Sequence, residues 1–264
     1  MPFYGQFDIS EVAVILLVDV GNSAVKSALV DDSDVITLLD SVVYPCPQGT
    51  DLKASLTLLW KDVLKVEQVF LANVGRDELA DVVIAVAKQL WGASVTLVKV
   101  TRSACDVRNR YSVIEQLGVD RWLAVIGARH SHVEQNIIVV DIGTAINVEL
   151  LSANEYQGGV ILPGLSLMHD ALVGRAYGIS SLIDYPQQII GKSTRQCVNS
   201  GVYFGLAGAI DRVIGEMQQV LSVRAKVILC GGGADVLVDL LKVDVEIDMN
   251  LIFRGLLEVA KCES

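Results

Sequence analysis

The sequence predicts a duplicated α/β fold in which each half begins with antiparallel strands and continues with alternating helices and strands. A strand–turn–strand pattern occurs twice, around Asp19-Val20-Gly21 in the first half and around Asp141-Ile142-Gly143 in the second. In both halves, segments with apolar residues at helical spacing then alternate with short β-type runs. Apolar residues make up 52% of the 264 residues, which is enough for two buried cores.

The composition excludes some classes of binding partner for this protein. The net charge of −10 argues against binding to nucleic acid or to an anionic membrane surface. It does not argue against a nucleotide, because backbone amides can build a local anion site. The five cysteines are widely spaced and form no zinc-type pair, so we expect reduced thiols and a cytoplasmic protein. The apolar run at residues 12–18 is too short to span a bilayer.

The first half is predicted to hold three antiparallel strands, followed by two helices that alternate with two short strands. The strands are expected at 14–19, 24–30, 35–43, 69–72 and 95–100, and the helices at 52–66 and 78–91. Residues 1–11 are expected to be an N-terminal extension, and 12–125 to form the first domain.

The second half, expected to form a domain over 126–264, repeats this order. Its strands are predicted at 137–141, 146–151, 159–162 and 227–230, and its helices at 165–177, 199–220, from 234, and from 248–250 to 261. A further helix running to about residue 129 is expected to precede the second hairpin. A ligand is expected in the cleft between the two halves.

The repeated turn suits a nucleotide. Its aspartate offers oxygen ligands, which hard cations and their bound waters prefer. Its glycine lets backbone N–H groups approach phosphate oxygens closely, and the amide and hydroxyl side chains that follow can donate hydrogen bonds. Two such hairpins could hold one polyphosphate from opposite sides.

A second informative stretch is Gly118-Val119-Asp120-Arg121, where an acid and a base lie side by side at the start of a helix. An aspartate at a helix start is usually a cap, and that interpretation is favoured for the turn taken alone. Its position directly before the second hairpin favours a role in the cleft. Later, Gly231-Gly232-Gly233 follows a predicted strand; the glycines taken alone indicate a tight turn, and the resemblance described next implies a loop that binds adenosine.

The order of these features resembles the actin, Hsp70 and sugar-kinase superfamily, and their detail resembles the type III pantothenate kinases. The resemblance covers nearly all of the chain after about residue 12. It rests on Asp19-Val20-Gly21-Asn22-Ser23 with Lys26, Asn109-Arg110-Tyr111, Leu117-Gly118-Val119-Asp120-Arg121-Trp122, Asp141-Ile142-Gly143-Thr144-Ala145, Gly158-Gly159 to Pro163-Gly164, Ser193-Thr194 before Ser200-Gly201, and Arg254-Gly255-Leu256. It implies two ribonuclease H-like domains with mixed sheets, the actin-like ATPase fold.

The resemblance implies phosphorylation of the primary hydroxyl of pantothenate by ATP, the first step toward coenzyme A. It assigns the acceptor of the hydroxyl proton to Asp120. It assigns ATP binding to Asp19, Val20, Gly21, Asn22, Ser23, Ala24, Val25, Lys26 and Thr144. It assigns pantothenate binding to Tyr111, Gly118, Val119, Asp120, Arg121 and Thr194. It also implies a homodimer with the active site near the subunit interface, where the partner could supply the threonine.

By the same resemblance, a monovalent cation, K⁺ or NH₄⁺, is expected at Asp141, and Mg²⁺ should accompany ATP. The chain departs from the usual family pattern after the second turn, where Asn147 and Glu149 replace a threonine and an aspartate. These replacements could change cation affinity. Gly158-Gly159 and Pro163-Gly164 bracket a short strand and mark either simple turns or a loop that shapes the substrate site.

Two other classes of function compete with the kinase. A nucleotide-binding regulatory protein could retain this fold without catalysis, although the intact Asp19, Asp120, Arg121, Asp141 and Thr144 argue against that loss. An ATP-driven chaperone or filament of the actin kind would need extra subdomains, for which this chain is too short.

Overall fold

The computed structural model describes residues 15–46, 51–132, 134, 136–175, 183–186, 188–221 and 224–263. These residues form two compact units. The first contains the described residues of Met1–Val100, Gly118–Leu123 and Ile252–Ser264, and the second contains those of Thr101–Leu117 and Ala124–Leu251. The N-terminal extension expected at residues 1–11 lies outside the described residues.

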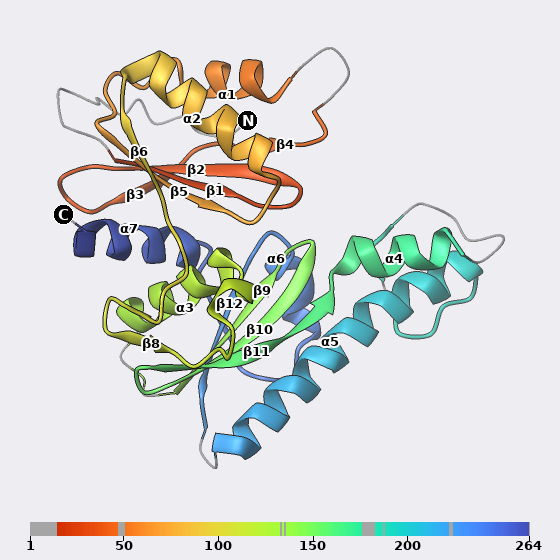
Figure 1. The fold of residues 1–264 in the computed structure, drawn as a ribbon. Coiled ribbons are helices and arrows are strands. Elements are labelled where there is room, and N and C mark those ends of the chain that lie inside the picture. Colours follow the sequence, from red (N-terminus) through yellow and green to blue (C-terminus); the bar gives the residue numbers. More distant parts are fainter. Residues whose placement is uncertain are drawn as a thin grey trace. The chain divides into compact units, whose positions relative to one another are not determined.

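Each unit is built on a mixed sheet. In the first, the strand order is β3-β2-β1-β5-β6, with β4 also paired to β2. Its strands are β1 (Ile15–Val20), β2 (Ala24–Val30), β3 (Ile36–Leu38), β4 (Val42–Val43), β5 (Gln68–Asn73) and β6 (Ser94–Leu97). Neighbours β1 and β2 run antiparallel, whereas β1, β5 and β6 run parallel (Figure 1).

The second sheet has the order β13-β12-β9-β10-β11-β8-β7. Its strands are β7 (Ser103–Ala104), β8 (Val107–Asn109), β9 (Asn136–Ile142), β10 (Ala145–Ser152), β11 (Glu155–Pro163), β12 (Lys226–Cys230) and β13 (Glu246–Ile247). Strands β11-β10-β9-β12-β13 repeat the order and the antiparallel and parallel pairing of β3-β2-β1-β5-β6. This match confirms the predicted duplication and its mixed sheets.

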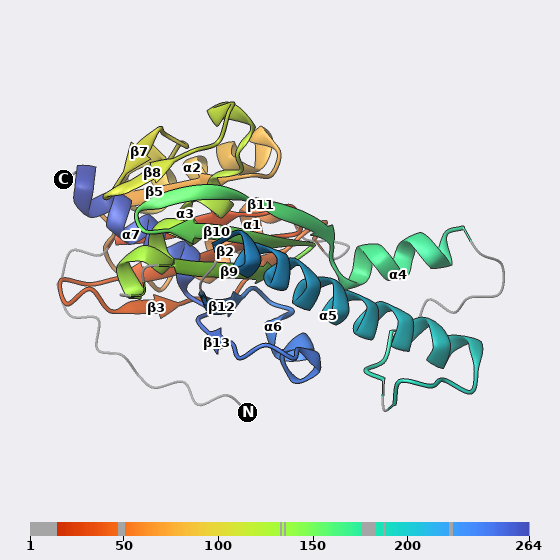
Figure 2. The same ribbon diagram turned by 90° about the horizontal axis from the view of Figure 1, so that it is seen from below.

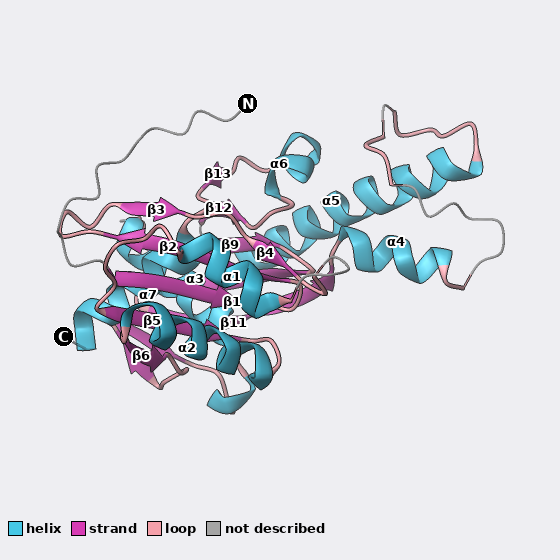
Figure 3. Ribbon diagram, turned by 90° about the horizontal axis from the view of Figure 1, so that it is seen from above, coloured by secondary structure: helices cyan, strands magenta, loops and turns pink. Residues whose placement is uncertain are grey.

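Helices α1 (Leu52–Trp60) and α2 (Asp77–Trp91) cover one face of the first sheet, as Figure 3 shows from the side of these helices. Asp51 caps α1 by accepting a hydrogen bond from the Ala54 N–H at 2.6 Å. Acidic residues occupy the first turn of α2, where their negative charges interact favourably with the helix dipole. The helix is capped at its C-terminal end by Gly92 in the left-handed conformation, with φ of 68°.

The prediction that α1 extends to residue 66 is wrong, because the helix ends at Trp60. Val63 and Val66 follow this end and are buried in the first core. Their positions in the sequence continue the apolar spacing of the helix, although their backbone is not helical. The indole Nε1 of Trp91 donates to the Val63 carbonyl at 2.9 Å. Burial in a non-helical segment therefore mimicked helical periodicity.

In the second unit, α5 (Thr194–Leu221) packs on the sheet, and α4 (Leu165–Val173) lies beside it (Figure 2). Helix α5 begins five residues before the predicted start at 199, and the Ser193 hydroxyl accepts a hydrogen bond from the Gln196 N–H at 3.3 Å. The short helix α6 (Ala234–Leu237) follows the glycine turn. Two single-turn 3₁₀ helices complete this unit, at Ile114–Gln116 and Val238–Leu240.

The start of α3 (Val119–Ser131) and nearly all of α7 (Leu251–Glu263) belong to the first unit, although both follow the first 100 residues that make up most of it. A Cβ added to Gly255 would lie 2.0 Å from the Leu123 carbonyl oxygen, so α7 packs directly on the start of α3. Lys261 also forms an ion pair with Asp34 at 2.8 Å. The sequence-based division at residue 125 instead places α7 in the second domain and residues 101–117 in the first.

Candidate active site

The first hairpin joins β1 to β2 through a four-residue connection between the paired residues Val20 and Val25. Within it, the Gly21 N–H donates to the Ala24 carbonyl at 3.0 Å. Asp19 lies directly across the ladder from Lys26, on the same face of the sheet. Asp19 is only 6% exposed, whereas Lys26 is exposed. The hairpin therefore combines an inner carboxylate with an outer ammonium group.

The segment after β5 fixes the base of this hairpin. The N–H groups of Val74 and Gly75 both donate to the Val20 carbonyl, at 3.0 and 3.2 Å. A Cβ on Gly75 would lie 2.8 Å from the Gly21 carbonyl oxygen, so only glycine permits this approach. The Tyr44 hydroxyl also donates to the Gly21 carbonyl.

Tyr44 reports the electrostatics around the hairpin. Burial raises the pKa of its hydroxyl, the Asp19 charge raises that pKa further, and Arg76 partly opposes the effect. Deprotonation of Tyr44 would place a second negative charge near Asp19, which explains why the Asp19 charge raises the pKa of the hydroxyl. Tyr44 therefore stays a neutral donor to the turn.

The Gly118–Arg121 turn lies beside the same edge of the first unit. A Cβ on Gly118 would lie 3.6 Å from Cγ1 of Val74, the residue bonded to the hairpin. Asp120 folds back over Gly118, since the same Cβ would meet Asp120 Oδ1 at 2.5 Å. That oxygen also accepts a hydrogen bond from the Arg121 N–H at 2.7 Å. The carboxylate is half-buried, and Arg121 is buried, with 6% exposure.

The second hairpin repeats the first with a shorter turn. Three residues connect the paired Ile142 and Ile146, and the Gly143 N–H donates to the Ala145 carbonyl at 2.9 Å. Asp141 lies across from Asn147, which therefore occupies the position that Lys26 has in the first hairpin. Thr144 is exposed at the tip.

The three-glycine turn lies against this second hairpin. Strand β12 pairs in parallel with β9, which brings Cys230 beside Asp141. A Cβ on Gly231 would lie 2.2 Å from Asp141 Oδ1, and Gly231 has a φ of +85°. The Gly233 N–H donates to the Ile142 carbonyl at 2.8 Å. The predicted nucleotide loop and the predicted phosphate turn thus form one continuous surface of the second unit.

Two predicted substrate residues belong to the second unit. The Tyr111 N–H donates to Asn109 Oδ1 at 2.9 Å, and Arg102 Nη1 donates to the Tyr111 carbonyl at 2.8 Å. Thr194 is the exposed first residue of α5. Tyr111 and Thr194 therefore lie in a different compact unit from the Gly118–Arg121 turn.

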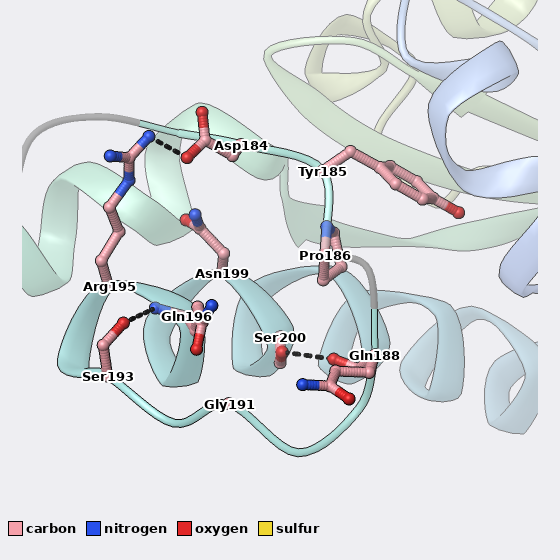
Figure 4. Close-up of a pocket in the computed structure, with 10 residues that line it drawn as sticks. All are labelled: Asp184, Tyr185, Pro186, Gln188, Gly191, Ser193, Arg195, Gln196, Asn199 and Ser200. Atoms are coloured by element: carbon pink, nitrogen blue, oxygen red, sulfur yellow. Dashed lines mark hydrogen bonds and ion pairs between the residues drawn. The ribbon is translucent and has the colours of Figure 1, made fainter.

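A cavity of about 370 Å³ lies at the N-terminal end of α5, next to Thr194 in the chain (Figure 4). Its lining is polar: Arg195 forms an ion pair with Asp184, and the Ser200 hydroxyl donates to the Gln188 carbonyl at 3.0 Å. Asn199, 4% exposed, also lines it. The start of α5 thus presents a hollow of the size of a small ligand, lined mainly by residues with polar side chains.

Several contacting residues were not anticipated from the sequence. Tyr44 donates a hydrogen bond to the first turn, and Gly75 lies close to it. Tyr156 stacks on Tyr111. The only sequence signal for Tyr156 is its place two residues before Gly158-Gly159. Tyr44 and Gly75 show no local pattern, because their contacts join segments distant in the chain.

Comparisons with known proteins identify the family of this chain. The type III pantothenate kinase family model matches residues 15–216. A type III pantothenate kinase of Alkalilimnicola ehrlichii is 32% identical over 247 residues, covering 93% of this chain and 97% of the relative.

Two solved structures share the fold. A protein of the Baf family of transcriptional activators from Campylobacter jejuni aligns with a TM-score of 0.56 and 20% identity, over 93% of this chain and 97% of its own. A glucokinase of the ROK family from Streptomyces griseus aligns with a TM-score of 0.50 and 13% identity, over 94% and 98%. The predicted sugar-kinase type of fold is confirmed, and the chain belongs to the type III pantothenate kinase family.

Proposed function

We propose that this protein transfers the terminal phosphoryl group of ATP to the primary hydroxyl of pantothenate, giving 4′-phosphopantothenate for coenzyme A synthesis. The observation that carries the proposal is the contact of the Asp120 turn with Val74, which in turn bonds the first phosphate hairpin. A carboxylate held at the edge of a phosphate site suits the removal of a hydroxyl proton during phosphoryl transfer.

The two hairpins bind ATP in this proposal. Asp19 to Lys26 and Thr144 are the residues proposed to contact its phosphates. Lys26 is exposed and can place its ammonium group on a phosphate oxygen. The Gly231–Gly233 turn accepts the adenosine end, since glycine leaves room for a close approach. Mg²⁺ accompanies ATP and neutralises charge on its phosphates.

Asp120 acts as the general base, a role that contributes about 10²–10⁴-fold. Arg121 holds the pantothenate carboxylate, because a buried guanidinium presents a fork of donors in a site of low dielectric constant. The backbone of Gly118 and Val119 shapes the pocket around the substrate. Tyr111 and Thr194 are the remaining residues proposed to bind pantothenate.

Asp141 is proposed to bind the monovalent cation. Its carboxylate and the Asn147 side chain across the ladder provide oxygen donors, the type that K⁺ accepts. In the part of the chain that the structure describes, no three His, Cys, Asp or Glu side chains form a metal-binding group. Backbone carbonyls and ATP phosphates would supply the remaining oxygen atoms.

The protein is proposed to act as a cytoplasmic homodimer with the active site near the subunit interface. Exposed apolar side chains on β11 and α4 support the dimer: Ile161 is 58% exposed and Leu167 is 45% exposed. Gly201 and Gly208 of α5 have open space where a Cβ would lie, so this helix can approach a partner closely. Among the described helices, none is both long and apolar enough to cross a membrane.

A coupled assay of ADP release, with and without pantothenate, tests the proposal. We expect ADP release that depends on pantothenate and is faster in potassium than in sodium buffer. Retained ATP binding without pantothenate-dependent ADP would instead favour the nucleotide-binding regulator. Equal rates in both buffers would remove the cation from the proposal but leave the kinase.

A further inference from the structure

A buried carboxylate and a buried phenol lie behind the proposed substrate residue Tyr111. Glu149 is 1% exposed and Tyr156 is 0% exposed. The Tyr156 hydroxyl donates a hydrogen bond to Glu149 Oε2 at 2.7 Å. Burying a carboxylate is costly unless it is hydrogen-bonded, and the Tyr156 hydroxyl supplies one such bond. Glu149 lies on β10, away from the turn of the second hairpin, and Tyr156 lies on the next strand, β11.

The sheet is shaped to allow this contact. Glu149 pairs across the ladder with Gly159, and a Cβ at Gly159 would lie 2.0 Å from Glu149 Oε2. Because Gly159 has no side chain, the Glu149 carboxylate can occupy this space and reach the Tyr156 hydroxyl. A register shift after Leu150 brings Tyr156 opposite Leu151, on the same face as Glu149. The two neighbouring glycines, Gly158 at φ of +111° and Gly159, thus shape the surroundings of a polar pair.

The ring of Tyr156 is stacked on the ring of Tyr111. Their centroids are 6.2 Å apart and their planes differ by 5°, an offset parallel arrangement. The backbone of Tyr111 is fixed separately, by Asn109 Oδ1 and by Arg102 Nη1. Asn109 is itself fully buried and pairs with Tyr156 in the parallel ladder between β8 and β11. Both the backbone and the ring of Tyr111 are therefore held by neighbours.

We propose that Glu149 and Tyr156 are positioning residues that fix the ring of Tyr111 for pantothenate binding. This inference rests on the proposed function, in which Tyr111 contacts pantothenate. The hydrogen bond to Glu149 sets the tilt of the Tyr156 ring, and the stacked Tyr111 ring follows it. A ring fixed before binding loses less rotational freedom when the substrate arrives, which lowers KM for pantothenate. ATP binding depends on other residues and should not respond.

Two substitutions at Tyr156 separate the hydrogen bond from the stack. Tyr156→Phe keeps the ring but removes the hydroxyl, and we expect KM for pantothenate to rise about 3- to 10-fold. Tyr156→Leu also removes the stack, and the rise should exceed about 10-fold. In both variants KM for ATP should stay within about twofold of the wild-type value. General destabilisation would not raise KM for pantothenate while leaving KM for ATP unchanged.

Glu149 offers a matched pair of variants. Glu149→Gln keeps an oxygen that accepts the phenol hydrogen bond and should stay near wild type in KM for pantothenate. Glu149→Ala removes the acceptor and should raise that KM as Tyr156→Phe does. Thermal unfolding of each variant reports how much of the folded enzyme remains. Similar rises in KM for Glu149→Gln and Glu149→Ala would contradict a role for the hydrogen bond.

A double-mutant cycle tests whether the effect passes through Tyr111. In a Tyr111→Ala background, Tyr156→Phe should leave KM for pantothenate unchanged, because the ring that it positions is gone. Additive effects of the two substitutions would overturn the proposal. So would an unchanged KM for pantothenate in a folded Tyr156→Leu variant while the wild type turns over normally. A wild type without pantothenate-dependent ADP would remove the proposed function, and this inference with it.

Discussion

Single glycines bring the two hairpins against their neighbours. Gly75 approaches the first turn, and Gly231 lies against the Asp141 carboxylate. At Gly231 the backbone also has a positive φ, so a side chain there would be strained as well as crowded. The geometry of the proposed ATP site thus depends on the absence of Cβ atoms at a few positions.

We expect Gly231→Ala to weaken ATP binding. The added Cβ would lie 2.2 Å from Asp141 Oδ1, so either the turn or the carboxylate must move. KM for ATP should rise at least about 10-fold, and KM for pantothenate should change less. Gly232→Ala is the matched control, because no atom lies within 4 Å of the Cβ position at Gly232. Equal effects of the two substitutions would contradict the assignment.

Asp120→Asn should stop turnover without loss of ATP binding. The asparagine keeps an oxygen that can accept the Arg121 N–H, so the turn should survive, but the amide cannot take a proton at neutral pH. We expect kcat to fall about 10²–10⁴-fold. Titration calorimetry with a non-hydrolysable ATP analogue checks that binding persists. Near-normal kcat would remove Asp120 from the role of base.

The ion pair of Lys226 with Glu246, at 2.6 Å, predicts a pH-dependent contribution to stability. The hydrogen bond from Lys226 lowers the pKa of Glu246 below its usual value of 4.5. The pair therefore stabilises the fold above the unfolded-state pKa, and that stabilisation is lost as the pH falls through the lower folded-state pKa. In urea unfolding, Glu246→Gln should be less stable than the wild type at neutral pH, and the difference should shrink as the pH falls through the lowered pKa of Glu246. A constant difference would contradict this.

At the scale of elements, the first unit depends on the layer that α1 and α2 form over the sheet. Trp60, at the end of α1, is fully buried, and its Nε1 donates to the Ser27 hydroxyl of β2 at 3.1 Å. Its ring centroid lies 5.9 Å from that of Trp91, at the end of α2. One side chain therefore links both helices to the hairpin strand that follows the phosphate turn.

Trp60→Ala should destabilise the protein strongly. It leaves a large cavity and removes the hydrogen-bond partner of Ser27, and such changes cost about 3–5 kcal/mol. Leu58→Ala is the control, since Leu58 is 64% exposed and its loss should cost less than about 0.5 kcal/mol. Urea unfolding measures both. A small effect of Trp60→Ala would show that the helical layer tolerates a cavity at this position.

At the scale of the whole molecule, the open glycine face of α5 and the exposed apolar residues of β11 and α4 predict a dimer. Light scattering should give twice the 28.4 kDa mass of the chain. Gly208→Arg should shift the protein toward the monomer, because a long charged side chain would fill the space open at Gly208. Lys53→Glu, on the exposed side of α1, is the control. A monomeric wild type would exclude the dimer.

The sequence by itself determined the duplicated hairpins, most helices and the family, because strand–turn–strand chemistry and amphipathic spacing are local properties. It misjudged the end of α1, where buried valines outside a helix kept a helical spacing.

Only the tertiary structure decided which distant residues meet. The contacts of Gly75 with the first turn, of Gly231 with Asp141, and of Glu149 with Tyr156 each join different strands or loops. Such contacts depend on strand register and on the closeness that glycine permits, and neither leaves a periodic pattern in the chain.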